Sequence, residues 1–413
     1  MKAYLVGGAV RDTLLNFPVR ERDWVVIGET PEAMLKRGFF EVGKDFPVFL
    51  HPETKEEYAL ARTERKTSHG YKGFAVHATP DVTLEEDLIR RDLTINAIAM
   101  LDDGSLIDPY NGQADLKNKI FRHISPSFCE DPVRVLRIAR FCARYKHLGF
   151  TIAPETQALM QAMVTQGEID FLVPERVWAE TKKALAEQTP TAYFQALRDC
   201  GALERIFPEI NALFGVPQTV EYHPEIDTGI HTLMVLEQAC LLTDDLSVRF
   251  AALTHDLGKA LTPKENWPHH YGHETLGLSA LKKLCRRLRV PNEYIKLAQQ
   301  VMEYHTHCHR AKELKPSTLC KLFCSLNAFK SALQFEAFLT ACEADAKGRL
   351  GHENNSYPQA NYLRALQKAA ASVDTRDILN SDLQGKAIGD AIFNLRSAAI
   401  KKTKHHLTTT AQD

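Results

Sequence analysis

The pattern of hydrophobic and polar residues changes once along the 413-residue chain. Up to about residue 120, short apolar runs alternate with helix-like stretches, which is typical of mixed α and β structure. The strand-like runs are 3–8, 24–28, 46–51, 58–62 and 98–109. From about Asp131 such runs almost vanish, and long amphipathic stretches replace them at 131–145, 174–187 and 191–207. We therefore predict an α/β head followed by an all-helical body.

Chain length and loop composition predict further divisions. A chain of this length exceeds what one hydrophobic core usually supports, so several domains are expected. Loops rich in Pro and Gly near 207–230 and 261–272 are candidate boundaries. The predicted division is a head at 1–140, a helical neck and body at 141–225, a third domain at 226–350 and a helical tail at 351–413.

Composition narrows the class of protein. Hydrophobic residues make up 44% of the chain and charged residues 25%, which is ordinary for a globular protein, and no apolar run approaches the length that spans a membrane. The nine cysteines form no C-x-x-C pair, which predicts reduced thiols and a cytoplasmic location. The formal net charge is −1, so nucleic-acid binding would depend on local basic patches.

The first candidate for chemistry is the stretch LVGGAVRD, where a strand-like run meets Gly7 and Gly8. A dinucleotide fold requires G-x-G-x-x-G, and the third glycine is missing here. A strand that ends in glycines still lets backbone N–H groups approach a phosphate closely, and Arg11 has a charge suited to the same phosphates. The alternative interpretation is an ordinary tight turn.

Two carboxylates follow at the start of the next strand-like run. Glu21 and Asp23 lie two residues apart, so their side chains point to one face of a strand. Adjacent carboxylates repel, and a divalent cation is a good reason to hold them together. Glu57, in the run EEYALAR, is a weaker candidate for a third carboxylate. A solvated charged loop is the alternative interpretation.

Arginines recur at helical spacing in the stretch EDPVRVLRIARFCAR. Arg134, Arg137, Arg140 and Arg144 are spaced three, three and four residues apart, which places them along one helix stripe. Aligned arginines repel each other unless something negative lies beside them, and a triphosphate or an RNA backbone would serve. Asp131, followed by a proline, can also be a simple helix cap.

Five motifs now stand in order along the chain: LVGGAVRDTLLNFPVRERD, RRDLTINAIA, DPYNG, EDPVRVLRIAR and PERVWAE. Together they resemble the successive motifs of CCA-adding enzymes, the tRNA nucleotidyltransferases of the polymerase-β-like superfamily. The closest resemblance is to the bacterial class in which an HD phosphohydrolase domain follows. This implies an α+β fold class: a polymerase-β-like head with a small mixed sheet, an all-α neck and body, and a helical HD domain.

The resemblance also implies roles in the head. Glu21 and Asp23 would be catalytic and hold Mg²⁺, although the family usually has Asp-x-Asp and the first carboxylate here is Glu. Asp92 and Asn96 would lie near the ribose, while Asp131 and Arg134 would present hydrogen-bonding edges to the base of CTP or ATP. The whole nucleotide-binding set that the resemblance implies is Gly8, Arg11, Arg91, Asp131, Arg134, Arg137 and Arg140.

Histidines concentrate in one window, where nine of the 17 fall between His223 and His309. The pair His255-Asp256 follows an apolar run, and His231 and Asp345 complete a candidate set of four metal ligands. This pattern resembles the HD superfamily of metal phosphohydrolases, in which His255 and Asp256 would be catalytic. His273 and His305 are candidates for a second metal or for substrate phosphate. The metal implied is a divalent transition metal, with Ni²⁺ as a candidate.

The sequence thus predicts an enzyme that adds CCA to tRNA from CTP and ATP, with a second site for phosphatase, 2′-nucleotidase and 2′,3′-cyclic phosphodiesterase activity. The expected partner is the acceptor arm of tRNA, and no association with a membrane is expected. The expected oligomeric state is a monomer or a weak homo-oligomer. Rival readings are a poly(A) polymerase, an HD phosphohydrolase with an inactive head, and an RNA-binding protein with two dead sites. A (p)ppGpp synthetase/hydrolase would place the HD domain first.

Overall fold

The computed structural model describes residues 1–19, 21–42, 47–66 and 74–409. These residues form two compact units, Met1–Ile206 and Phe207–Asp413. The first is mixed α and β and the second is helical in its described residues, as the change in the sequence pattern predicts. The finer four-part division stays a prediction, and Arg20, within the first motif, lies outside the described residues. No helix in the described ranges is both long and apolar enough to cross a membrane.

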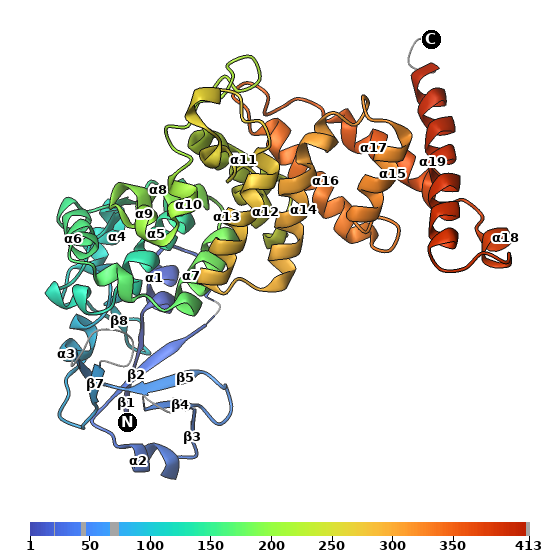
Figure 1. Ribbon diagram of the computed structural model, residues 1–413. Coiled ribbons are helices and arrows are strands. Elements are labelled where there is room, and N and C mark those ends of the chain that lie inside the picture. Colours follow the sequence, from blue (N-terminus) through green and yellow to red (C-terminus); the bar gives the residue numbers. More distant parts are fainter. Residues whose placement is uncertain (20, 43–46, 67–73, 410–413) are drawn as a thin grey trace. The chain divides into compact units, whose positions relative to one another are not determined.

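The first unit is built on a seven-stranded mixed sheet (Figure 1). Strand β2 is antiparallel to β1 and parallel to β5. All five strand-like runs of the sequence contribute strands to this sheet. The strands, in sheet order, are β3 (Phe40–Glu41), β4 (Val48–Leu50), β5 (Glu57–Leu60), β2 (Asp23–Ile27), β1 (Lys2–Val6), β8 (Ala99–Met100) and β9 (Leu106–Ile107). Two small sheets pair β6 (Thr63–Lys66) with β7 (Phe74–His77) and β10 (Ile120–Phe121) with β11 (Thr151–Ile152).

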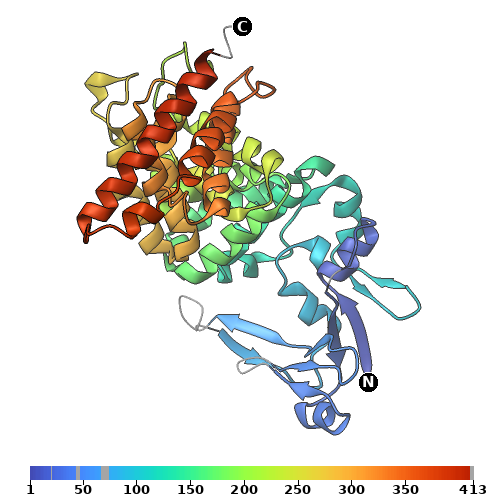
Figure 2. The ribbon, with the colours of Figure 1, turned by 90° about the vertical axis from the view of Figure 1, so that its right-hand side faces the viewer.

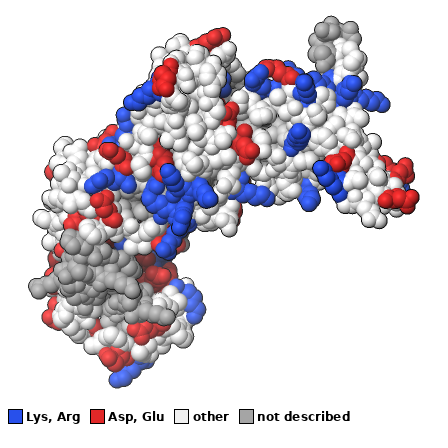
Figure 3. Space-filling view, in the orientation of Figure 1, with Lys and Arg blue, Asp and Glu red and all other residues white. Residues whose placement is uncertain are grey.

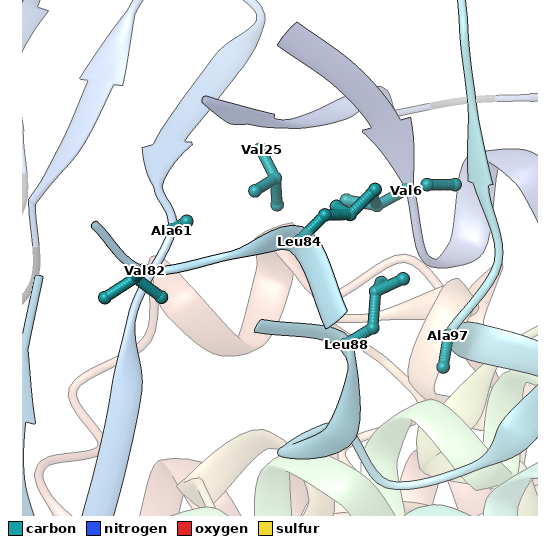
Figure 4. Packing of buried hydrophobic residues seen from close by; sticks show 8 residues of the cluster. Val6, Val25, Ala61, Val82, Leu84, Leu88 and Ala97 are labelled. Carbon is teal, nitrogen blue, oxygen red and sulfur yellow. The ribbon is translucent and has the colours of Figure 1, made fainter. Parts of the chain in front are cut away.

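Both faces of the large sheet are apolar, which explains the unbroken run Trp24–Ile27. Val25 joins a buried cluster with Val6 and with Leu84 and Leu88 of helix α3 (Leu84–Ile89), as Figure 4 shows. Its neighbour Val26 packs on the opposite face, in a second buried cluster. Because successive side chains of a strand point to opposite faces, a strand covered on both sides needs apolar residues throughout.

Helices complete the first unit. The predicted stretches 131–145 and 174–187 become α5 (Val133–Tyr145) and α7 (Pro174–Ala186). The stretch 191–207 becomes two helices, α8 (Thr191–Asp199) and α9 (Ala202–Ile206), because the chain turns at Gly201 with φ +81°. The remaining helices are α1 (Gly8–Leu14), α2 (Pro31–Lys36), α4 (Gly112–Asn118) and α6 (Pro154–Thr165).

The second unit packs its helices around α11, α12, α14 and α16 (Figure 1). The long terminal helix α19 lies along α15 and α17, and Figure 2 shows it as the red helix beside the orange ones. Among the described residues of this unit there is no strand. Its helices are α10 (Pro208–Asn211), α11 (Thr228–Leu242), α12 (Leu246–Thr254), α13 (His273–Leu288), α14 (Asn292–His309), α15 (Pro316–Ser325), α16 (Ala332–Lys347), α17 (Pro358–Ala371), α18 (Arg376–Leu379) and α19 (Lys386–Thr409).

Candidate active sites

The carboxylates of the first unit meet at one end of the sheet. Asp23 is the first residue of β2, and the parallel register places Glu57 of β5 directly opposite it, as expected. Loss of hydration raises the pKa of the Asp23 carboxyl, Arg91 opposes the rise, and Glu21 adds to it. Within the described residues, no three ligand atoms converge around this pair. A metal there would complete its coordination with substrate oxygens, as Mg²⁺ commonly does.

The glycine turn brings an arginine over the end of β1. Gly7 adopts φ +70°, and a Cβ there would lie 3.1 Å from Nη1 of Arg91. Arg91 is tied to Asp87 through Nη2 (3.2 Å), while its Nε is buried and has no hydrogen-bond partner among the residues that the structure describes. The Arg91 side chain is 18% exposed whereas Arg11 is buried, so a phosphate can reach the Arg91 guanidinium more readily. Arg91 is therefore the arginine of this turn best placed to receive a phosphate.

Arg11, by contrast, is satisfied within the protein. Its guanidinium is buried and donates to Asn96 Oδ1 (2.6 Å) and to Asp12 Oδ1 (2.9 and 2.8 Å). Asp12 also accepts hydrogen bonds from Arg144 (2.9 Å) and from the Tyr145 hydroxyl (2.9 Å). Arg11 thus links α1 to Asn96 as well as lying beside the glycine turn, and its role in phosphate binding stays a prediction.

The arginine stripe of α5 forms as predicted, but the protein supplies the negative partners. Arg137 Nε donates to Asp92 (2.7 Å) and Arg140 Nε donates to Glu180 of α7 (2.7 Å). Arg134 instead donates to backbone carbonyl groups, including that of Ser127 (2.8 Å). An external phosphate is therefore not needed to hold the stripe together.

Asp92 is the centre of this internal network. It is 6% exposed and accepts hydrogen bonds from Asn96 Nδ2 (2.8 Å) and Arg137 Nε. Burial favours a higher pKa, but the charge of Arg137 and the hydrogen bonds outweigh it and lower the pKa of the carboxyl. Asp92 is therefore ionised at neutral pH and fixes both Asn96 and Arg137.

Asp131 is fixed by a residue that sequence reasoning left aside. Arg176, at the start of α7, donates two hydrogen bonds to the two oxygens of Asp131 (3.1 and 2.8 Å). Oδ1 of Asp131 also accepts from the Val133 N–H (3.1 Å), so the aspartate caps α5 as well. The signal for Arg176 was its place in the motif PERVWAE. It orients the carboxylate that the resemblance assigns to base recognition.

The second unit brings all four predicted HD ligands together. The Nε2 atoms of His231 and His255 lie 3.2 and 3.7 Å from Asp345 Oδ1, and Asp256 Oδ2 lies 3.0 Å from His255 Nε2. His231 Nδ1 donates to Gly348 O (3.1 Å) and His255 Nδ1 donates to Ala252 O (2.8 Å). These bonds leave each Nε2 lone pair directed inward, as metal ligation requires.

A second group shares Asp256. His273 Nε2 and His305 Nε2 lie 3.5 and 3.7 Å from Asp256 Oδ1, and both Nδ1 atoms bond to backbone carbonyls. The two oxygens of Asp256 thus face the two groups. These residues were the predicted candidates for a second metal or for substrate phosphate, and that choice stays open.

The donor chemistry of the four-residue group fits a divalent metal. The Nε2 atoms of His231 and His255 and both oxygens of Asp256 are buried without an aligned hydrogen bond among the described residues. Although burial opposes ionisation, nearby cationic and histidine side chains hold the pKa of the Asp256 and Asp345 carboxyls well below their usual range. Two imidazoles and two carboxylates are typical ligands of a transition metal.

Two further residues act on this group from outside. His309 Nε2 donates to Asp345 Oδ2 (2.6 Å), and the Tyr357 hydroxyl lies 2.9 Å from His309 Nδ1. The spacing of His305 and His309, one helix turn apart, was a signal that could have indicated His309. The group opens into a pocket of about 1050 Å³ whose lining also includes Lys259 and Arg349.

Comparison with known families agrees with this arrangement. A family model described as the Poly A polymerase head domain matches residues 3–122, and one for a probable RNA and SrmB-binding site of polymerase A matches 149–214. An HD domain model matches 228–329. The fold and the two sites therefore define a nucleotidyltransferase head joined to an HD domain.

Whole-chain relatives define the family more closely. The chain is 64% identical to the multifunctional CCA protein of Methylococcus capsulatus over 98% of this chain and 95% of the relative. It is 55% identical to that of Hahella chejuensis over 100% and 98%. The chain belongs to the family of multifunctional CCA proteins.

Solved structures support the fold. A CCA-adding enzyme in apo form II aligns with a TM-score of 0.66 at 19% identity, over 99% of this chain and 92% of that one. The Thermotoga maritima CCA-adding enzyme complexed with tRNA aligns with a TM-score of 0.62 at 18% identity, over 98% and 91%. The α+β fold class, with a polymerase head, helical body and HD domain, is confirmed.

Proposed function

We propose that this protein adds and repairs the 3′-terminal CCA of tRNA from CTP and ATP without a nucleic-acid template. The observation that carries the proposal is its match to multifunctional CCA proteins over nearly the whole chain, with the motif residues gathered in one unit. The 3′-hydroxyl of the RNA attacks the α-phosphate of the nucleotide, and pyrophosphate leaves.

Glu21 and Asp23 fit the requirement for divalent ions in this reaction. Bound Mg²⁺ would lower the pKa of the attacking hydroxyl and neutralise charge on the leaving oxygens. The partly exposed guanidinium of Arg91 binds the triphosphate, and Asp131, oriented by Arg176, accepts a hydrogen bond from the exocyclic amino group of cytosine or adenine. Uracil lacks that group, so it is rejected.

The test uses purified protein, Mg²⁺ and a tRNA that ends at the discriminator base. CTP alone should add two nucleotides, and a third should appear only when ATP is also present. A long ladder with ATP alone would instead indicate a poly(A) polymerase. Failure to extend the tRNA with any nucleotide would contradict the proposal.

The second unit supports a separate hydrolytic activity on phosphate esters. The buried Nε2 atoms of His231 and His255, which have no aligned hydrogen bond among the described residues, support metal binding. The metal, with Ni²⁺ as a candidate, would supply an activated water. Arg349, which lines the pocket, is a cation suited to the phosphate, whereas Lys259 pairs with Asp256 Oδ2 (2.7 Å). We propose phosphatase, 2′-nucleotidase and 2′,3′-cyclic phosphodiesterase activities here, which would prepare blocked RNA ends for CCA addition in the cytoplasm. Hydrolysis of 2′,3′-cyclic AMP, compared between metal-depleted and Ni²⁺-loaded protein, tests this assignment.

A further inference from the structure

One face of α13 is strongly basic, and neither proposed activity uses it. After Glu274, the helix and its capping residue contain five cationic residues and no carboxylate. All five are exposed, whereas the opposite side of the helix, including Leu281, Leu284 and Leu288, is buried in the second unit. The five are Lys282, Lys283, Arg286, Arg287 and Arg289. Figure 3 shows Lys and Arg side chains gathered over the region of α13.

Ion pairing within the protein explains only part of this charge. Arg287 donates two hydrogen bonds to Glu209 (2.7 and 2.6 Å). Among the residues that the structure describes, Lys282, Lys283 and Arg286 have no carboxylate within ion-pair distance. Like charges on adjacent helix turns repel, so an anionic partner that lies along this face would stabilise it.

The helix that carries the basic face begins at the HD pocket. His273 and Glu274, the first residues of α13, line that pocket, and Lys282 follows about 14 Å farther along the helix axis. At the same end, the rings of His269 and Tyr271 stack with centroids 5.7 Å apart, and Tyr271 is 77% exposed. Both rings line the pocket. Exposed stacked rings beside a basic track are the combination that binds single-stranded nucleic acid.

We propose that the single-stranded 3′ end of an RNA binds along α13 of the second unit. The terminal nucleotide enters the HD pocket against the His269–Tyr271 pair, and the upstream phosphates lie on Lys282, Lys283 and Arg286. The helix from His273 to Arg289 is about 24 Å long, enough for roughly the four nucleotides of the shortest single-strand sites. The inference rests on the proposed hydrolytic function and names its substrate as a phosphate-blocked RNA end.

Binding tests the basic face directly. A fluorescent RNA hexamer with a 3′-phosphate is titrated with the full-length protein in EDTA, and its anisotropy is recorded from 50 to 200 mM salt. We expect the triple variant K282E/K283E/R286E to bind on the order of tenfold more weakly at low salt and to lower the salt slope by about 2, since each phosphate contact contributes about 0.7. RNA bound elsewhere on the chain contributes equally to wild type and variant.

A matched control separates a local site from a general charge effect. The variant K386E/K401E/K402E makes the same charge change at exposed positions of α19. It should bind the hexamer like wild type. The proposal would be overturned if both triple variants lost affinity for the hexamer equally, or if the α13 variant lost none. Because binding is read without metal, an inactive HD site would contradict the hydrolytic function and not this surface.

Kinetics distinguish an RNA end from a free nucleotide. Wild type should hydrolyse a hexamer ending in a 2′,3′-cyclic phosphate with a kcat/KM about tenfold above that for 2′,3′-cyclic AMP. The α13 variant should lose this preference for the hexamer, while its kcat and KM for 2′,3′-cyclic AMP stay unchanged.

The variant Y271A should raise KM for both substrates, and Y271F should keep the wild-type KM, because phenylalanine and tyrosine rings both stack on a base. Equal kcat/KM for the two substrates in wild type would indicate a free nucleotide as substrate and overturn the proposal.

Discussion

The base-recognition role proposed for Asp131 requires that the rotation of its carboxylate is restricted. Arg176 restricts it with two parallel hydrogen bonds, a geometry that lysine cannot reproduce. We predict that Arg176→Ala raises KM for CTP and ATP about tenfold and increases misincorporation of UTP, whereas unfolding free energy falls by about 1 kcal/mol or less because the pair is partly exposed. Single-turnover addition with each nucleotide measures the effect.

The lysine variant provides the control. Arg176→Lys keeps the charge but loses the paired hydrogen bonds, so it should behave like the alanine variant in base selection. If Arg176→Lys selects bases as wild type does, charge alone orients Asp131 and the role given to the paired geometry is wrong.

Asp92 gives a prediction for pH. Its pKa is lowered in the folded protein, so its contribution to stability is complete above the unfolded value near 3.9 and is lost as pH falls toward the folded value. We predict that Asp92→Asn lowers the unfolding free energy by about 2 to 3 kcal/mol at pH 7. The difference in unfolding free energy between Asp92→Asn and wild type should become smaller below about pH 4. Denaturant unfolding at several pH values measures it, and a difference that is constant with pH would contradict the ionised state.

Single-residue partnerships were the least predictable part of the sites. The sequence pattern placed the α5 arginines on one stripe, but their partners Asp12, Asp92 and Glu180 come from segments distant in the chain. No periodicity relates such segments, because only the packed fold brings them together. The convergence of three candidate HD ligands, His231, His255 and Asp256, was predictable because they stand in the histidine window, whereas Asp345 and Tyr357 lie outside it.

At the scale of elements, apolar runs predicted the strands well, and the register of β2 with β5 then placed Glu57 opposite Asp23. The short strands β3, β6, β7, β10 and β11 were missed, because none of them lies in an apolar run as distinct as those that contain β4, β5, β8 and β9. The turn between α8 and α9 depends on the positive φ of Gly201. The missed short strands and the turn at Gly201 change how the larger elements are connected, but they do not move the residues of either candidate site.

Close packing at one glycine gives a prediction for the HD region. Gly258 has a helical φ of −71°, so alanine is permitted there by the backbone. A Cβ would, however, lie 1.9 Å from His273 O and 2.7 Å from Gly277 N, and both are backbone atoms of α13. We predict that Gly258→Ala destabilises the second unit by about 3 kcal/mol. Hydrolysis should fall steeply while CTP addition persists.

Gly389, in α19, is the matched control. Apart from its chain neighbours and the nearby backbone of its own helix, no atom of the described residues lies within 4 Å of a Cβ built there, and alanine favours a helix by about 1 kcal/mol over glycine. Gly389→Ala should therefore leave hydrolysis unchanged and stability equal or higher, as thermal unfolding would record. Similar losses in the two variants would show that the contact between Gly258 and α13 is not the cause.

At the scale of the whole molecule, the two candidate sites belong to different compact units and share no residue. We predict that Glu21→Ala or Asp23→Ala abolishes nucleotide addition and preserves phosphohydrolysis, and that His255→Ala or Asp256→Ala does the reverse. Parallel assays of the four variants with tRNA and with 2′,3′-cyclic AMP measure this. Loss of both activities in a correctly folded single variant would contradict separate sites.

Metal binding should distinguish the units thermodynamically. The four candidate HD ligands already lie together in the second unit, whereas no third ligand atom of the described residues joins the carboxylates of the first unit. Ni²⁺ at about 100 times its dissociation constant should therefore stabilise the second unit by about 2.7 kcal/mol, through binding to the folded state alone. In calorimetry of the metal-free protein, we expect added Ni²⁺ to raise the temperature of one unfolding transition and to leave that of the other unchanged.

His255→Ala should remove this temperature shift, whereas Glu21→Ala should retain it, because only the former loses a candidate HD ligand. A shift that persists in His255→Ala would place the metal elsewhere and contradict the ligand set.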